Sequence, residues 1–197
     1  MNLLEMDRRK ALGNIGKGIG TIIVTPSIVS IFQRCHTSKT FNPTFFKSED
    51  FNLISRLMEI IIPKTDIPGA IELKLPEFVD NYIDAVWDKK SKENINKSLK
   101  LFKDVAKTKF GQKPTRDLTF DELDKLLDKF LKSKDINSDE EKFAASFTTD
   151  LRNLTINAFR TNEYIGENIL AYQPVPGRNV GCVDLDEATG GKAWSLQ

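Results

Sequence analysis

The side chains that could do chemistry are few and widely spaced along the chain. His36 is the only histidine, and it lies in a polar stretch. We expect it to be solvated, because a general base needs a cleft and an orienting partner. The acidic pairs Asp121–Glu122 and Glu140–Glu141 could suggest acid–base work. Both fall in the first turns of predicted helices, where the helix dipole favours negative charge, and that accounts for them.

The sequence contains none of the short motifs that mark common catalytic and cofactor sites. No G-x-G-x-x-G follows a strand, and there is no P-loop, C-x-x-C-H or G-x-S-x-G. The two cysteines, Cys35 and Cys182, do not form a zinc motif, because there is no C-x-x-C and only one histidine. In a chain that leaves the cytoplasm they could pair with each other or with a partner. The residues therefore predict no metal site and no enzyme that works alone.

Composition places the chain among ordinary globular proteins. Its 197 residues are 40% hydrophobic and 29% charged, which favours one domain with a proper core. The net charge is +1, and the basic residues do not gather into an aromatic-studded stripe. This composition argues against a general nucleic-acid binder.

The N-terminus differs in charge and hydropathy from the rest of the chain. Residues 1–34 carry five basic and two acidic residues, out of 29 and 28 in the chain. Arg8 and Arg9 precede Leu12–Phe32, a Gly-rich apolar run that holds one lysine and no acidic residue. A positive head before an apolar run is typical of an export signal, and the arginine pair indicates the twin-arginine pathway.

A membrane anchor that is never cleaved is the alternative for this segment. As a helix, Leu12–Phe32 would be roughly 31 Å long, about the thickness of a bilayer's hydrocarbon core. Four glycines and Pro26 weaken it as a lasting span. The sequence thus predicts a signal or anchor segment with its linker over residues 1–40, a helical domain over 41–170 and an irregular C-terminal arm over 171–197.

Five segments of the central domain have apolar residues at helical spacing. No segment shows the sustained alternation that strands require, so the chain is predicted to be all-α. We expect about five amphipathic helices in one orthogonal or bundle-like domain. The predicted helices begin near Ser48, Pro76, Ser91, Thr119 and Ser138.

Start and stop signals bound these helices. Pro63 ends the first helix, and Gly111 is a left-handed stop after the third. Ser91 is predicted to cap the third helix, while capping boxes at Thr119–Glu122 and Ser138–Glu141 open the fourth and fifth.

Two of the helices are expected to bury wide apolar faces. The inner face of the second consists of Phe78, Val79, Tyr82, Ile83, Val86 and Trp87. That of the fifth consists of Phe143, Phe147, Leu151, Leu154, Ala158 and Phe159.

The C-terminal stretch "AYQPVPGRNVGCVDLDEATGGKAWS" shows neither helical nor strand periodicity. Such a segment cannot satisfy its own backbone polar groups, so it must lie in water or borrow partners from a surface. We expect Tyr164–Trp194 to be an arm laid against a partner; the alternative is that it wraps its own helical domain. The predicted partner-binding residues are Tyr172, Pro174, Pro176, Gly177, Arg178 and Trp194.

Two stretches resemble a known family. They are "IIPKTDIPGAIELKLPEFVD", from Ile61 to Asp80, and "YQPVPGRNVGC" with the later "GKAW". Together with the arginine pair, they resemble the gluconate 2-dehydrogenase subunit 3 family over nearly the whole chain. The intervening helices match only in type and order.

The resemblance implies a non-catalytic small subunit of a periplasmic dehydrogenase for a sugar or polyol. Its partner would be a large FAD-containing subunit of the glucose–methanol–choline type, in some members beside a cytochrome c subunit with haem. The chain itself would hold no cofactor. It would carry the export signal, so that the folded partner travels with it through the twin-arginine machinery. The alternative function is a helical scaffold tethered to the inner membrane by an uncleaved N-terminal helix.

Overall fold

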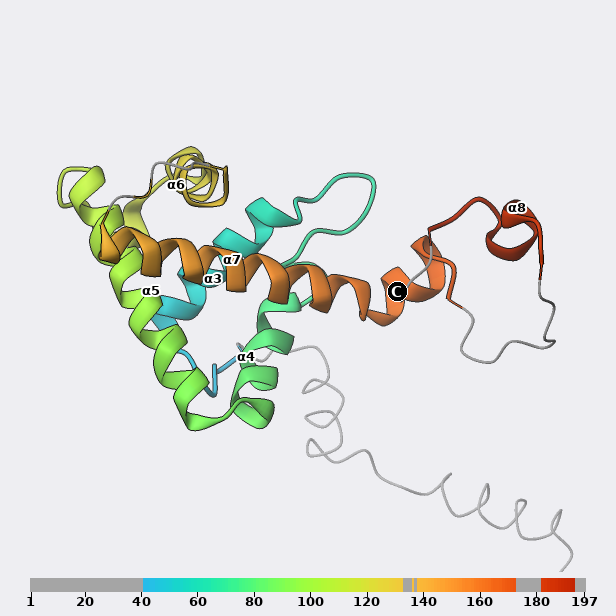
Figure 1. Cartoon of the computed structure of the whole chain (residues 1–197), viewed down its shortest axis with the longest axis horizontal. Helices are drawn as coiled ribbons and strands as arrows, with labels where there is room; N and C mark the ends of the chain where they lie inside the picture. The colour runs from blue at the N-terminus through green and yellow to red at the C-terminus, as the bar shows by residue number, and fades with distance from the viewer. Residues whose placement is uncertain (1–40, 133–135, 137, 173–181, 194–197) are drawn as a thin grey trace, which may run out of the picture. The chain divides into compact units, whose positions relative to one another are not determined.

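The computed structural model describes residues 41–132, 136, 138–172 and 182–193. The described residues from 42 onward belong to one compact unit (Figure 1). They are helical and contain no β-strand, which confirms the all-α prediction. The helices are α3 (Ser48–Ile61), α4 (Leu75–Val86), α5 (Lys89–Lys109), η1 (Thr115–Asp117), α6 (Phe120–Lys132), α7 (Asp139–Arg160), η2 (Ile165–Ile169) and α8 (Leu185–Thr189).

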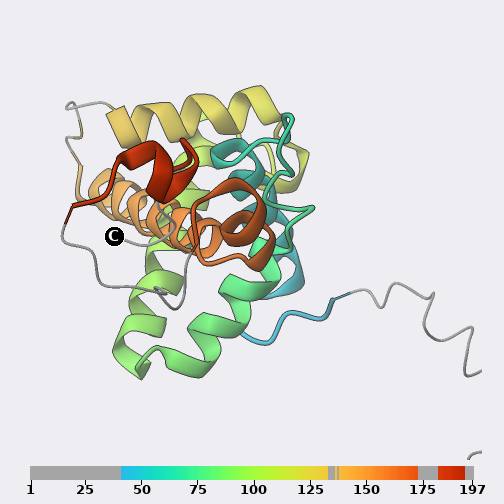
Figure 2. The same cartoon turned by 90° about the vertical axis from the view of Figure 1, so that its right-hand side faces the viewer.

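Helix α7 is the centre of the packing. It contacts α3, α4, α5 and α6, and its largest interface is with α5. In both views α7 runs between α6 above and α4 below (Figures 1 and 2). Phe102 of α5 lies at the middle of the core, fully buried, with its ring centroid 5.3 Å from that of Phe147 and 6.1 Å from that of Phe130. Three helices therefore share one aromatic cluster.

The helix boundaries follow the local signals in the sequence. The Thr119 backbone N–H donates to Glu122 Oε2 at 2.6 Å, and the Glu122 N–H donates to Thr119 Oγ1 at 3.2 Å, which is the predicted reciprocal capping box. The Glu141 N–H donates to Ser138 Oγ at 3.1 Å. Gly111, which follows Phe110, the C-cap residue of α5, adopts φ +65°, as expected of a left-handed stop.

The predicted cap of α5 is wrong by three residues. The helix begins at Lys89, and its N-cap is Asp88, whose Oδ1 accepts from the Ser91 N–H at 2.9 Å. Aspartate is as good a cap as serine, and a cap bonds to the N–H three residues later. Ser91 is therefore the donor of the capping bond and not its acceptor.

The expected inner face of α4 is only half correct. Val79 and Ile83 are buried, but Phe78, Tyr82 and Val86 are 50%, 39% and 60% exposed. The predicted residues cover two adjacent stripes of the helix, and only one stripe can face α3 and α7. In α7, Phe143 is likewise exposed rather than buried.

A fully buried carboxylate holds the start of the domain to α4. Asp80 Oδ2 accepts from the Thr44 N–H at 2.6 Å and from Thr44 Oγ1 at 2.9 Å. Its two oxygens also accept from the Phe45 N–H at 3.3 Å, and Oδ1 accepts from the Phe46 N–H at 2.9 Å. The Asp80 carboxylate thus accepts from the backbone N–H groups of three consecutive residues, 44–46.

The described part of the C-terminal arm contains a short helix that the sequence analysis did not predict. Asp184 Oδ1 accepts from the Asp186 N–H at 2.9 Å at the start of α8, and Gly190 ends the helix at φ +61°. Residues 171 and 193 approach each other, because the Ala171 N–H donates to the Ala193 carbonyl at 2.7 Å. The last described residue of the arm, Ala193, therefore lies next to its first residue, Ala171.

Within the described residues, no helix has both the length and the apolar character needed to cross a bilayer. Leu12–Phe32, the segment with the predicted signal or anchor, lies outside them.

Candidate functional site

The stretch from Ile61 to Asp80 is called the first motif segment here, and the stretch that begins at Tyr172 the second. The loop between α3 and α4 contains most of the first motif segment. It is folded back on itself, since the Ala70 N–H donates to the Ile62 carbonyl at 2.9 Å and the Thr65 N–H to the Ile67 carbonyl at 3.0 Å. Lys64 and Glu72 form an exposed ion pair at 3.0 Å, which contributes little to stability. The backbone hydrogen bonds therefore define the shape of this loop.

Gly69 is required where the loop passes over α3. A Cβ at this position would lie 2.3 Å from Glu59 Oε1 and 2.8 Å from the Lys64 backbone nitrogen. The other oxygen of Glu59, Oε2, accepts from the Ile71 N–H at 2.8 Å and ties the loop to α3. The glycine of the motif thus allows a close approach of two backbone segments.

Asn162, just beyond the end of α7, joins this loop to the following turn. Its Nδ2 donates to the Leu73 carbonyl at 3.4 Å, and its Oδ1 accepts from the Ile165 N–H at 3.4 Å. Its backbone carbonyl accepts from the Gly166 N–H at 2.8 Å, which starts η2. Asn162 therefore connects the first motif segment to the turn that leads into the second.

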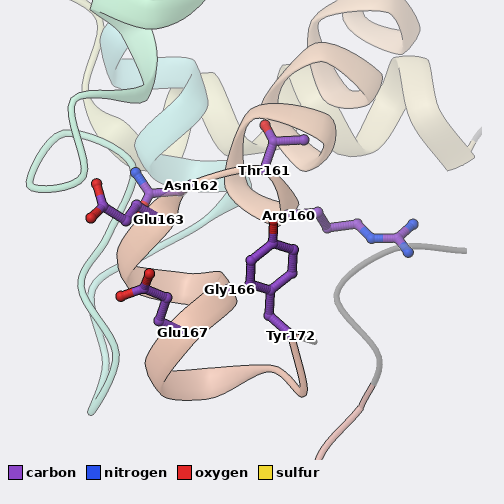
Figure 3. Close-up of a pocket in the computed structure, with 7 residues that line it drawn as sticks. All are labelled: Arg160, Thr161, Asn162, Glu163, Gly166, Glu167 and Tyr172. Carbon is purple, nitrogen blue, oxygen red and sulfur yellow. The ribbon is translucent and has the colours of Figure 1, made fainter. Parts of the chain in front are cut away.

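Two hollows meet at Asn162 and Glu163, and we call their lining the Asn162 face. The larger, of about 390 Å³, is lined by Arg160, Thr161, Asn162, Glu163, Gly166, Glu167 and Tyr172 (Figure 3). The other, of about 380 Å³, is lined by Pro68, Glu72, Leu73, Lys74, Asn162, Glu163 and Tyr164. Residues of both motif segments, which are far apart in the sequence, thus line adjoining hollows.

The ring of Tyr172 stands in the larger hollow (Figure 3). Glu163 and Glu167 lie on one side of it, and the Arg160 guanidinium points away on the other. Tyr172 lies close to Gly166, since a Cβ on this glycine would be 3.9 Å from Tyr172 Cβ. Tyr172 is 48% exposed and Tyr164 47%. Exposed tyrosines among charged groups suit recognition of another surface, because one side chain offers both apolar area and a hydrogen bond.

The structure places two of the predicted site residues. Tyr172 belongs to the Asn162 face, and Cys182 is exposed in the arm. The other predicted partner-binding residues, Pro174, Pro176, Gly177, Arg178 and Trp194, lie outside the described residues. So do Cys35, whose pairing with Cys182 stays a prediction, and the export-signal arginines, Arg8 and Arg9.

Sequence reasoning missed Asn162, Glu163 and Glu59. Glu59 reads as an ordinary polar position of a helix, and its role appears only when the loop folds over α3. An asparagine just after a long helix is a common terminator. Its contact with Leu73 spans 89 positions and leaves no local signal.

No group of three or more His, Cys, Asp or Glu side chains converges on a common point within the described ranges. The Asn162 face offers carboxylates, a guanidinium, an amide and two phenols. Groups of these kinds can bind a polar surface through hydrogen bonds and ion pairs.

Comparison with known proteins identifies the class. The family model for gluconate 2-dehydrogenase subunit 3 matches residues 48–177, which run from the start of α3 into the second motif segment. The chain belongs to the gluconate 2-dehydrogenase subunit 3 family and is thereby assigned to the accessory subunits of dehydrogenase complexes. Neither the curated proteins nor the solved structures contain a significant match.

Proposed function

We propose that this chain is the non-catalytic small subunit of a periplasmic, FAD-dependent dehydrogenase that oxidises a sugar or polyol. The large subunit, of the glucose–methanol–choline type, holds the FAD, and a cytochrome c subunit with haem is a further partner in complexes that contain one. The small subunit stabilises the large one and carries its export signal, Arg8 and Arg9, into the twin-arginine pathway.

The observation that carries this proposal is the meeting of the two motif segments at the Asn162 face. The family match covers the loop of residues 62–74 and Tyr172. In the structure these segments line adjoining hollows with exposed tyrosines. An exposed face that both motif segments share suits a subunit that acts by contact.

Truncation after Tyr172 tests the role of the arm. The core lies in α3 to α7, so the shortened chain should keep its helical circular dichroism. We expect it to lose most of its binding to the flavoprotein in a pull-down, because residues 173–197 contain most of the predicted contacts. Undiminished binding would end the arm hypothesis and leave the Asn162 face as the contact.

The export role has a separate test. Replacing Arg8→Lys and Arg9→Lys keeps both charges but removes the arginine pair. We expect both proteins to remain in the cytoplasm, measured by fractionation and immunoblotting, while complex formation is unchanged. Normal export of the flavoprotein with this double variant would refute the proposed role as signal carrier.

A further inference from the structure

One face of α4 exposes a row of large apolar side chains. Phe78, Tyr82 and Val86 follow one another at helical spacing and are 50%, 39% and 60% exposed. The rings of Phe78 and Tyr82 are stacked, with centroids 6.0 Å apart and planes 18° apart. Leaving such a row in water is unfavourable, and contiguous apolar rows on a surface mark interaction sites.

The row leads into a groove of about 560 Å³ at the junction of α4, α5 and α7. Val86 belongs to both, so the apolar row and the groove form one continuous surface, which we call the α4 groove. The groove is lined by Val86, Trp87, Asp88, Ser91, Asn94, Ile95, Ser98, Phe143, Ser146 and Asp150.

The groove lining is negatively charged. It contains the carboxylates of Asp88 and Asp150 and no lysine or arginine. Asp88 caps α5, whereas the contact of Asp150 within the described residues is a long hydrogen bond, accepted from Ser146 Oγ at 3.4 Å. Partial burial raises the pKa of Asp150, because it removes water from the carboxylate. A cation from a partner would restore the lost stabilisation of this charge.

Two further features of the lining indicate which groups the groove can bind. Ser98 is 5% exposed, and it lines the groove. Lys97 Nζ lies 4.6 Å from the ring centroid of Phe143, so this aromatic already has a cation over its face. The groove thus combines a hydroxyl, a weakly paired carboxylate and an aromatic wall.

We propose that the α4 groove binds a segment of the flavin-containing subunit that carries apolar side chains and an arginine or lysine. The apolar side chains lie along Phe78, Tyr82 and Val86, and the basic side chain pairs with Asp150. This inference rests on the proposed function and names a second contact beyond the Asn162 face. A second copy of the chain fits less well, because a symmetric contact would bring four carboxylates together.

A peptide titration tests the chemistry of the groove without the partner. In the full chain with Trp194→Phe, Trp87 is the only tryptophan and reports on the groove by its fluorescence. Acetyl-Leu-Leu-Arg-amide should bind about tenfold more tightly than its citrulline counterpart, which has the same shape without the charge. Asp150→Asn should abolish the difference, and Asp121→Asn, an exposed carboxylate on α6, should not. Equal affinities, or no fluorescence change at millimolar concentrations of either peptide, would overturn the proposal.

A second experiment uses the complete complex. The chain is purified with its flavoprotein, and the affinity is measured at low and high salt. We expect Phe78→Ala with Tyr82→Ala to weaken binding by about tenfold or more, while Phe120→Ala, 49% exposed on α6, leaves it unchanged. Asp150→Asn should reduce the salt dependence of binding. If the wild-type chain binds no flavoprotein, the proposed function fails; if it binds and these variants bind equally well, only the α4 groove proposal fails.

Discussion

Replacing Asp80 should unfold the domain at markedly lower urea concentration. Asp80→Ala removes the acceptor of the Thr44, Phe45 and Phe46 backbone N–H groups and of the Thr44 hydroxyl. The Phe46 N–H is buried, and leaving it unsatisfied costs about 1–3 kcal/mol. The lost bonds of Thr44 and Phe45 add about 1 kcal/mol each, so the free energy of unfolding should fall by about 3–5 kcal/mol. With a slope of about 2 kcal/mol per molar urea, the midpoint falls by about 1.5–2.5 M.

Urea unfolding followed by circular dichroism is the assay, and two further variants make it decisive. Asp80→Asn keeps the volume but turns an –NH₂ group toward backbone donors, so its loss should be smaller than that of alanine and larger than about 1 kcal/mol. Asp121→Asn, on the exposed side of α6, should change stability by less than about 0.5 kcal/mol. A loss below about 1 kcal/mol for Asp80→Ala would show that the start of the domain is not held by this carboxylate.

Three other changes have defined outcomes. Gly69→Ala places a Cβ 2.8 Å from the Lys64 backbone nitrogen, so thermal melting should show a loss of about 1–3 kcal/mol. In the wild type, hydrogen bonding to Lys113 lowers the pKa of Glu122 below its ordinary 4.5. The advantage of wild type over Glu122→Gln in urea midpoint should therefore be complete well above pH 4.5 and disappear as the pH falls through the lowered pKa; an equal advantage at pH 3 and pH 7 would contradict this. Phe102→Ala empties the centre of the core and should cost about 3–5 kcal/mol by urea unfolding, whereas a loss near 1 kcal/mol would mean that the cluster collapses around the gap.

The boundaries of the helices could be predicted because their causes are local. A capping box such as Thr119–Glu122 involves residues three positions apart, and Gly111 acts through its own φ. The same local reasoning misplaced the cap of α5, because Asp88 and Ser91 are both good capping residues and only the fold selects one.

The exposed face of α4 could not be predicted from periodicity. Phe78 and Val79 lie roughly 100° apart around the helix axis, and a period of 3.6 is satisfied by the stripe that contains either one. What decides is which stripe α3 and α7 cover, and that is tertiary information. The error is informative, since an apolar stripe that the chain leaves uncovered is the basis of the α4 groove.

The candidate site was predictable in its segments and not in its geometry. The proline- and glycine-rich motifs identified the loop of residues 62–74 and Tyr172 as special. The pairing of Asn162 with Leu73 depends on contacts between positions 89 apart in the chain, which no local pattern encodes. Likewise, Asp80 is one of many aspartates until its oxygens are seen to face residues 44–46.

The most direct measurement is of where the flavin and the activity reside. The tagged full chain is purified from its native host, and flavin absorbance and dye-linked sugar oxidation are measured before and after the subunits are separated. We predict that both flavin and activity accompany a second, larger polypeptide and are absent from the isolated chain. A tightly bound flavin and substrate turnover in the isolated chain would contradict the proposal that this subunit acts through its surfaces.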